Sequence, residues 1–214
     1  MEIKYYGQSC FVINANNISI AIDPYQEQWG LKKLKLSADI VLITHDHADH
    51  NNAEAVSLKS SKPDIINNPG EYEIKGVFIE GIDSYHDEEK GKTRGQNTIY
   101  TINLEKIKIC HLGDLGQPEL IDQQLERIGE VDVLMVPVGG NFTIDAVGAT
   151  KVINQIEPKI VIPMHYKMGG VDLDIAPVEE FLKQEGESVE PIDSLKISEK
   201  DLLSEGTKIL VLKS

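Results

Sequence analysis

The first half of the chain has the hydrophobic pattern of a strand-rich sheet. Three segments rich in β-branched and aromatic residues open it, EIKYY, CFVINA and ISIAID, and Gly7 and Asn16–Asn17 separate them as turn residues. The continuous apolar run ADIVLIT (38–44) is typical of a strand that is covered on both faces. A short helix is expected over 52–58, followed by the strands DIIN and VFIEGIDSYH with NPGEYEIKG as the turn between them.

The second half of the chain predicts alternating helices and strands. The polar, glycine-containing segment DEEKGKTRGQ indicates a mobile loop, after which NTIYTINL and IKICHL form a hairpin. Apolar residues at helical spacing, from Ala149 to Ile156, predict a helix over 145–156. The remaining elements are a helix over 118–127, the strands VDVLMVPV, KIVIPMH and KILVLK, and a helix beginning near Pro177. The order of elements favours two sheets between helices in one domain over residues 1–214.

Composition limits the class of protein. The chain of 214 residues is 41% hydrophobic and 26% charged, as in soluble globular proteins, and no apolar run approaches the roughly 20 residues of a membrane span. The N-terminus shows no secretory signal and the two cysteines form no CxxC pair, so we expect a cytoplasmic protein with reduced thiols. The net charge of −14 argues against nucleic acid as a partner, since phosphate binding needs clustered Lys and Arg. A homo-oligomer is left open.

Three of the six histidines lie within residues 45–50 of the segment ITHDHADHN, directly after the buried strand. His45, His47 and His50 share this stretch with Asp46 and Asp49. Imidazole and carboxylate groups together suit zinc, manganese or iron. The spacing differs from H-E-x-x-H, which places two histidines on one helix face.

Further candidate ligands close later strands. His86 ends GIDSYH, Asp114 lies in the turn HLGD, and His165 ends KIVIPMH. Alone, a strand-end histidine is more often a structural hydrogen-bonding group, and GD after a strand is commonly only a turn. Together with the cluster at 45–50, these positions predict a metal site at one edge of the sheets.

These residues resemble the metallo-β-lactamase superfamily over nearly the whole chain. More narrowly, the sequence is similar to its compact lactonase-like hydrolases, which are related to ascorbate-6-phosphate lactonase. The segments that carry this resemblance are GQSCFVI, IAIDPY, NPGEYEI, RGQNTIY, HLGDLG, VDVLMVPVGGNFTIDA and PKIVIPMHY. The resemblance implies a four-layer αββα sandwich with a dinuclear metal site on one rim.

Residue by residue, the resemblance implies a complete set of ligands. His45, His47 and His86 surround the first metal, and Asp49, His50 and His165 hold the second, with Asp114 bridging both. Gln8 departs from the pattern, because related sequences often have histidine there, in GHS. The nitrogen-rich set favours two Zn²⁺ ions, with Mn²⁺ or Fe²⁺ as alternatives.

Such a site predicts a metal-dependent hydrolase of a small ester-like, lactone-like or phosphoester substrate. Two dications roughly 3.5–4 Å apart can share a water and lower its pKa to about 7, which gives a metal-bridged hydroxide. Asp49 would orient this nucleophile as well as ligate, and Asp114 would hold the metal spacing. A phosphodiesterase or nuclease of the same superfamily and a non-catalytic metal-binding module are the alternatives.

Several other residues have two open interpretations. Asp23 is either a hydrogen-bond partner of a ligating histidine or a turn residue, and His111 is either structural or a proton shuttle. Arg94 and Lys167 could contact a substrate anion, although lone cations are usually solvated. Trp29 belongs to an aromatic loop that lies at the pocket rim, packs in the core or contacts another subunit, and Glu71 has no assigned role.

Overall fold

The computed structural model describes residues 1–58, 62–202 and 206–214. Its strands are β1 (Glu2–Gly7), β2 (Cys10–Ala15), β3 (Ile18–Ile22), β4 (Leu36–Ser37), β5 (Ile40–Leu42), β6 (Val56–Ser57), β7 (Asp64–Ile66), β8 (Gly70–Ile74), β9 (Val77–Tyr85), β10 (Gln96–Leu104), β11 (Ile107–His111), β12 (Val133–Pro137), β13 (Ile160–Met164), β14 (Leu195–Lys196) and β15 (Lys208–Ile209). The α-helices are α1 (Asp122–Ile128), α2 (Ala146–Ile156) and α3 (Val178–Glu185), and the 3₁₀ helices are η1 (Ala53–Ala55) and η2 (Glu199–Leu202).

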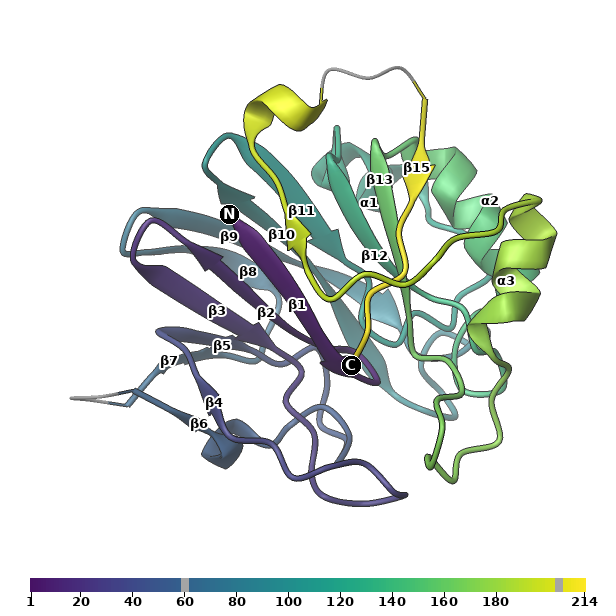
Figure 1. The fold of residues 1–214 in the computed structure, drawn as a ribbon, viewed down its shortest axis with the longest axis horizontal. Helices are drawn as coiled ribbons and strands as arrows, with labels where there is room; N and C mark the ends of the chain where they lie inside the picture. Colours follow the sequence, from purple (N-terminus) through teal and green to yellow (C-terminus); the bar gives the residue numbers. More distant parts are fainter. Residues whose placement is uncertain (59–61, 203–205) are drawn as a thin grey trace.

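Two large sheets form the body of the molecule (Figure 1). The first has the order β14-β1-β2-β3-β5-β7, and the second has the order β15-β13-β12-β11-β10-β9-β8. Both sheets are mixed. In the first sheet, β1, β2 and β3 pair antiparallel, whereas β3, β5 and β7 pair parallel. In the second sheet, β9, β10 and β11 pair antiparallel, whereas β11, β12 and β13 pair parallel. On the second sheet, α1 packs against β9 and α2, and α2 packs against α3.

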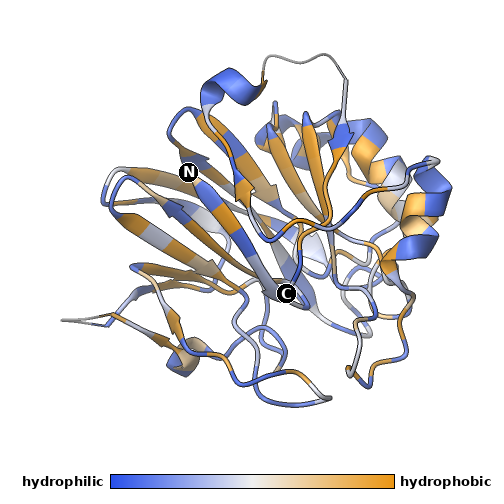
Figure 2. Cartoon of the chain, viewed as in Figure 1, coloured by the Kyte–Doolittle hydropathy of each residue, from blue (hydrophilic) through white to orange (hydrophobic). Residues whose placement is uncertain are grey.

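An apolar core fills the space between the sheets. Figure 2 shows hydrophobic residues along the strands of both sheets, and the largest fully buried side chains of these strands include Tyr100, Phe11 and Ile13. A second apolar cluster covers the outer face of the first sheet, where Tyr25, Leu34 and Val56 pack with Val12 and Val41. The layer on this face consists of β4, β6, η1 and the segment before β4, in agreement with the predicted αββα sandwich architecture of the superfamily.

Some predicted elements are wrong in detail. The helix expected over 52–58 is the single 3₁₀ turn η1, because Val56 and Ser57 pair instead with Leu36 and Ser37 in a small sheet. The segment 68–76, expected as a turn, contains β8, which pairs antiparallel with β9 around the tight turn at Lys75–Gly76. The helix expected over 118–127 begins at Asp122.

The C-terminal part of the chain also differs from its pattern. KILVLK forms a strand only over Lys208–Ile209 in β15, and Leu212 makes a separate bridge to Ile192. The short β14 was not predicted, and it pairs with β1 through Leu195 and Lys196. A strand of two residues is too short to show the alternation of apolar and polar side chains by which strands are predicted. Within the described ranges, no helix combines the length and hydropathy of a membrane span.

Four strands end at the same rim of the sandwich. β5 leads into the loop with the histidine cluster, and β9, β11 and β13 lead to His86, Asp114 and His165. β9 and β11 both pair antiparallel with β10, and β11 is parallel to β12 and β12 to β13, so the carboxyl ends of β9, β11 and β13 lie on one edge. The topology therefore brings together residues that are far apart in the sequence.

Candidate metal centre

Seven side chains meet at this rim in two groups of potential metal ligands. The first group is His45, His47 and His86, and the second is Asp49, His50, Asp114 and His165. Within each group, the ligand atoms all lie within 4.8 Å of one another. These are the seven positions that the sequence singled out, and their side chains could hold two ions.

Asp114 lies at the centre of the cluster. Its Oδ2 atom is 3.2 Å from Nε2 of His50, 3.3 Å from Nε2 of His165 and 3.4 Å from Nε2 of His86. Nε2 of His45 is 3.9 Å away. One carboxylate oxygen thus faces imidazoles of both groups, which is the position that a bridging ligand requires.

Gly113 makes this position of Asp114 possible. Its φ is +57°, and a Cβ atom there would lie 2.3 Å from Asn97 Oδ1 and 2.8 Å from Thr44 Cβ. Asn97 in turn accepts a hydrogen bond from the backbone N–H of Asp114. The glycine of the GD turn therefore allows the backbone to approach Thr44 and Asn97 closely.

Asp23 fixes the orientation of two imidazoles. Its carboxylate lies 2.9 Å from Nδ1 of His50 and accepts hydrogen bonds from the backbone N–H and the hydroxyl of Thr44. The Thr44 oxygen lies 2.9 Å from Nδ1 of His45. Because Asp23 takes the hydroxyl proton, Thr44 accepts from His45, and each of the two imidazoles, when neutral, carries its lone pair on Nε2. Asp23 thus has the role of a hydrogen-bond partner of candidate ligands.

Two buried histidine nitrogens that lack a hydrogen-bond partner indicate whether the site fits a metal ion. Nε2 of His45 and Nε2 of His50 are buried and have no hydrogen-bond partner within the described residues. An unpaired buried acceptor is costly in free energy unless another group satisfies it. A divalent cation in each group would take up these lone pairs, so the donor set fits metal ions.

The charges of the cluster are strongly coupled. Burial alone would raise the pKa of Asp114, but the imidazoles of His165 and His50 hold it well below its usual range. Burial would lower the pKa of His50, yet Asp114, Asp23 and Asp49 together raise it well above its ordinary value. In contrast, burial and the neighbouring His50 hold the pKa of His45 well below its ordinary value. The metal-free site therefore keeps a proton on His50 beside ionised carboxylates.

Two residues of the turn between β1 and β2 contact the cluster. Gln8 Nε2 donates a hydrogen bond to Asp49 Oδ2 over 3.1 Å and lies 3.0 Å from His165 Nε2. Ser9 Oγ donates to Asp114 Oδ1. Sequence reasoning did not assign these contacts, nor those of Thr44 and Asn97. For Gln8, Ser9 and Asn97 the only signal was their position in GQSCFVI and RGQNTIY, two segments that carry the family resemblance.

The cluster opens into a cavity of about 370 Å³. Its lining includes Gln8 and Arg94 and the apolar side chains of Trp29, Phe142 and Leu173, besides Ala48 and five of the candidate ligands. A neighbouring cavity of about 450 Å³ lies beside His45 and His47 and shares Arg94. The cluster is therefore reachable from two adjoining hollows.

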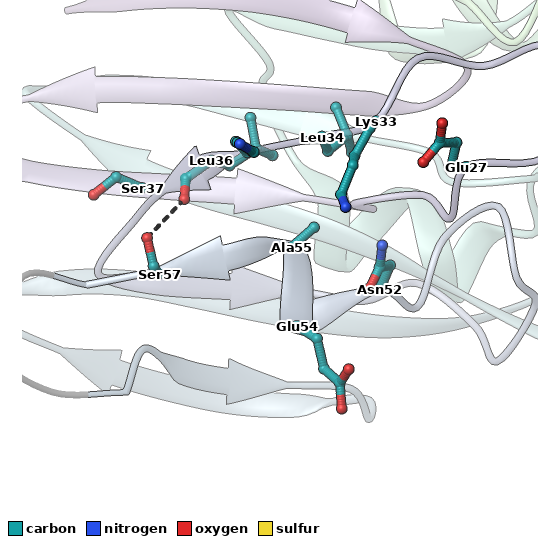
Figure 3. Close-up of a pocket in the computed structure, with 10 residues that line it drawn as sticks. Glu27, Lys33, Leu34, Leu36, Ser37, Asn52, Glu54, Ala55 and Ser57 are labelled. Carbon is teal, nitrogen blue, oxygen red and sulfur yellow. Dashed lines mark hydrogen bonds between the residues drawn. The ribbon is translucent and has the colours of Figure 1, made fainter.

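A larger hollow lies elsewhere. It has a volume of about 600 Å³ and lies against β4, β6 and η1, where Figure 3 shows Lys33, Glu27 and Glu54 at its edge. None of the candidate metal ligands lines it. Volume alone is thus a poor guide to the functional site in this molecule.

The structure shows the contacts and exposure of the residues whose interpretation the sequence left open. His111 is buried, with Nε2 2.9 Å from the Ser9 carbonyl and Nδ1 accepting from Gly113 N–H, which is a structural role. Lys167 donates to the Leu173 carbonyl and does not line the cavity. Glu71 is exposed on β8. The segment expected as a mobile loop is organised by Asp87, whose carboxylate accepts four backbone N–H groups, including that of Arg94.

Comparisons with known proteins agree with this fold. Residues 2–165 match the family model described as the beta-lactamase superfamily domain. A UPF0173 metal-dependent hydrolase of Thermococcus onnurineus is 30% identical and covers 90% of this chain and 95% of its own length. A UPF0173 metal-dependent hydrolase of Alkaliphilus metalliredigens is also 30% identical, over 78% of this chain and 85% of its own.

A solved structure gives the same result. A Thermotoga maritima protein assigned as a Zn-dependent hydrolase of the metallo-β-lactamase superfamily superimposes with a TM-score of 0.80 at 34% identity, covering 99% of this chain and 97% of its own. The fold and site thus define a metal-dependent hydrolase. The chain belongs to the metallo-β-lactamase superfamily and, within it, to the UPF0173 metal-dependent hydrolases. The predicted superfamily and enzyme class are confirmed.

Proposed function

We propose that this hydrolase cleaves a small ester-like, lactone-like or phosphoester substrate at a centre of two divalent metal ions. The observation that carries the proposal is the position of Asp114 Oδ2 between the imidazoles of His50, His165 and His86, at 3.2–3.4 Å from each. A single ion would leave one of the two ligand groups without a role. The lactonase-related branch within the superfamily stays a prediction.

The proposed ligands follow the two groups. His45, His47 and His86 hold one ion, Asp49, His50 and His165 hold the other, and Asp114 bridges them. The set of five imidazoles and two carboxylates favours Zn²⁺, with Mn²⁺ and Fe²⁺ as alternatives. His47 is exposed while His45 and His86 are buried, so the first group faces the solvent on one side.

We assign different roles to Asp49 and Asp114 at such a centre. When bound, the two ions supply a hydroxide nucleophile at neutral pH and stabilise the developing oxyanion. Asp49 lines the cavity, keeps 18% of its side chain exposed and is held by the Gln8 amide, so it can orient the attacking water. Asp114 is nearly fully buried and fixed by Ser9, which suits a group that maintains spacing.

The setting of the reaction is also proposed. We place the protein in the cytoplasm as one domain over residues 1–214, acting on a small molecule and not on nucleic acid. Cys10 and Cys110 are both free and buried, which supports a reducing compartment. The net charge of −14 disfavours nucleic acid as a partner.

Metal content and substrate panels test the proposal together. Reconstituted protein should hold about two ions per chain by elemental analysis and should hydrolyse at least one carbonyl ester, lactone or phosphoester. Asp49→Ala should lower kcat by at least about 100-fold. Asp46→Asn is the matched control, because Asp46 is exposed in the same loop and bonds only to Asn51 among the described residues.

Other outcomes would contradict parts of the proposal. Fewer than about two ions per chain would reject the dinuclear centre. Turnover of RNA or of bis-p-nitrophenyl phosphate alone would favour the phosphodiesterase or nuclease function. Full metal loading without turnover of any substrate class would favour a non-catalytic metal-binding module.

A further inference from the structure

We propose that Arg94 binds an anionic oxygen group of the substrate, a carboxylate or phosphate, while Trp29, Phe142 and Leu173 bind its apolar body. The inference rests on the proposed hydrolytic function and names the class of substrate: a small amphipathic ester that carries a negative charge away from the bond to be cleaved.

The first argument is the place of Arg94. It lines both the cavity above the candidate ligands and the adjoining cavity beside His45 and His47. It is the one Lys or Arg among the residues that line either of these two hollows. A substrate that reaches the cluster through either hollow therefore passes this guanidinium.

The second argument is that Arg94 is held in place. Its backbone N–H donates to Asp87 Oδ2, within the turn that Asp87 organises. Its Nη2 donates to the Asn141 carbonyl over 3.1 Å, and its guanidinium carbon lies 4.8 Å from the centre of the Phe142 ring. A guanidinium that is fixed before binding loses less conformational entropy when it meets an anion.

The third argument is the missing counter-ion. Within the described ranges, Arg94 takes part in no ion pair, although its side chain is half-buried and the chain has 35 acidic residues. The Asn141 carbonyl occupies one donor of the guanidinium, and the others stay available for the forked hydrogen bonds that carboxylate and phosphate accept. Lys167, the other cation that the sequence singled out, donates to the Leu173 carbonyl and lines neither hollow.

The fourth argument is the apolar wall beside this charge. Trp29, Phe142 and Leu173 line the same cavity as Arg94, and 39% of the Trp29 residue surface is exposed. Apolar walls with a few convergent polar groups are typical of small-molecule sites. A ligand with an apolar body and one anionic end satisfies both features at once.

Selectivity for charge tests the inference in the zinc-reconstituted protein. Monophenyl succinate, which carries a carboxylate, is compared with its neutral methyl ester, and phenyl esters with a phosphate end give the second anion. The wild type should favour the anionic esters by at least about tenfold in kcat/KM. Arg94→Met should bring this ratio close to one, mainly through KM, and Arg94→Lys should restore part of it.

A matched variant separates a local effect from a loss of surface charge. Lys92 is exposed in the same turn, pairs with Glu89 and lines neither cavity, so Lys92→Met should keep the wild-type preference. Equal kcat/KM for charged and neutral esters in the wild type would overturn the inference while leaving the hydrolase intact. Absence of turnover of every ester, lactone and phosphoester would instead reject the proposed function.

A binding measurement keeps the inference testable without turnover. Trp29 is the single tryptophan of the chain and lines the cavity, so its fluorescence reports occupancy. Phenylacetate and phenyl phosphate should shift this signal, phenylacetamide should bind at least about tenfold more weakly, and Arg94→Met should remove the difference. Equal binding of the acid and the amide, or an unchanged preference in Arg94→Met, would show that Arg94 serves only to hold Phe142 and Asn141.

Discussion

Nδ1 of His50 lies 2.9 Å from Oδ2 of Asp23, and both side chains are fully buried. The pair joins the end of β3 to the loop after β5 and leaves Nε2 of His50 facing Asp114 and Asp49. An aspartate that ligates nothing thus decides which nitrogen of a candidate ligand is available.

Asp23→Asn should weaken zinc binding by about 10–100-fold, because an amide cannot accept from Thr44 and His50 as a carboxylate does. Competition with a chromophoric chelator measures the affinity. Asp64→Asn, a change of an exposed aspartate on β7, is the control and should bind zinc as the wild type does. Equal affinities in the two variants would show that Asp23 serves the fold alone.

Metal binding should become tighter as the pH rises, and the gain should continue above about 6.5, because the pKa of His50 lies well above this ordinary histidine value. Asp114, Asp23 and Asp49 outweigh burial and raise the pKa of His50, so the metal-free protein still carries this proton at neutral pH. The proton must leave Nε2 before the nitrogen can bind an ion. Calorimetry in buffers of different ionisation enthalpy should therefore detect proton release at pH 7, and a binding heat independent of the buffer would contradict this.

Chelation of the metal should lower the melting temperature. An ion that binds only the folded state at about 100 times its Kd stabilises the fold by roughly 2.7 kcal/mol. The variant His50→Asn should lose most of this gain, whereas Asp46→Asn should keep it, because Asp46 belongs to neither ligand group and accepts a hydrogen bond from Asn51. Differential scanning calorimetry with and without zinc gives the comparison. An equal gain in His50→Asn would place the ion elsewhere.

Gly113→Ala should reduce the free energy of unfolding by about 2–4 kcal/mol, since a methyl group meets Asn97 and Thr44 and the residue has a φ of +57°. Gly76→Ala separates the two causes. Gly76 has a φ of +79° but no atom within 4 Å of a Cβ, so only the backbone strain of about 1–2 kcal/mol remains. Urea unfolding measures both, and equal losses would mean that the close approach at Gly113 is relieved at little cost.

The sequence indicated most of the sheet and helix pattern because long elements repeat their hydrophobic period. The apolar spacing of Ala149, Val152, Ile153 and Ile156 agrees with the buried face of α2, and Asp145 caps this helix by accepting from Gly148 N–H. The hydrophobic pattern gave the wrong element where pairing between distant strands determined the structure. Val56 and Ser57 form β6 because Leu36 and Ser37 lie beside them, a contact that no local period reports.

The sequence by itself determined which side chains could serve as metal ligands, because ligand chemistry belongs to residue type and the histidine cluster lies in one short loop. Only the tertiary structure decided how they are used. Asp23 meets His50 across 27 residues, Gln8 meets Asp49 across 41, and Ser9 meets Asp114 across 105. Such contacts depend on how two sheets pack and where their strands end. The orientation of each imidazole and the environment of Arg94 therefore follow from the fold and not from local sequence.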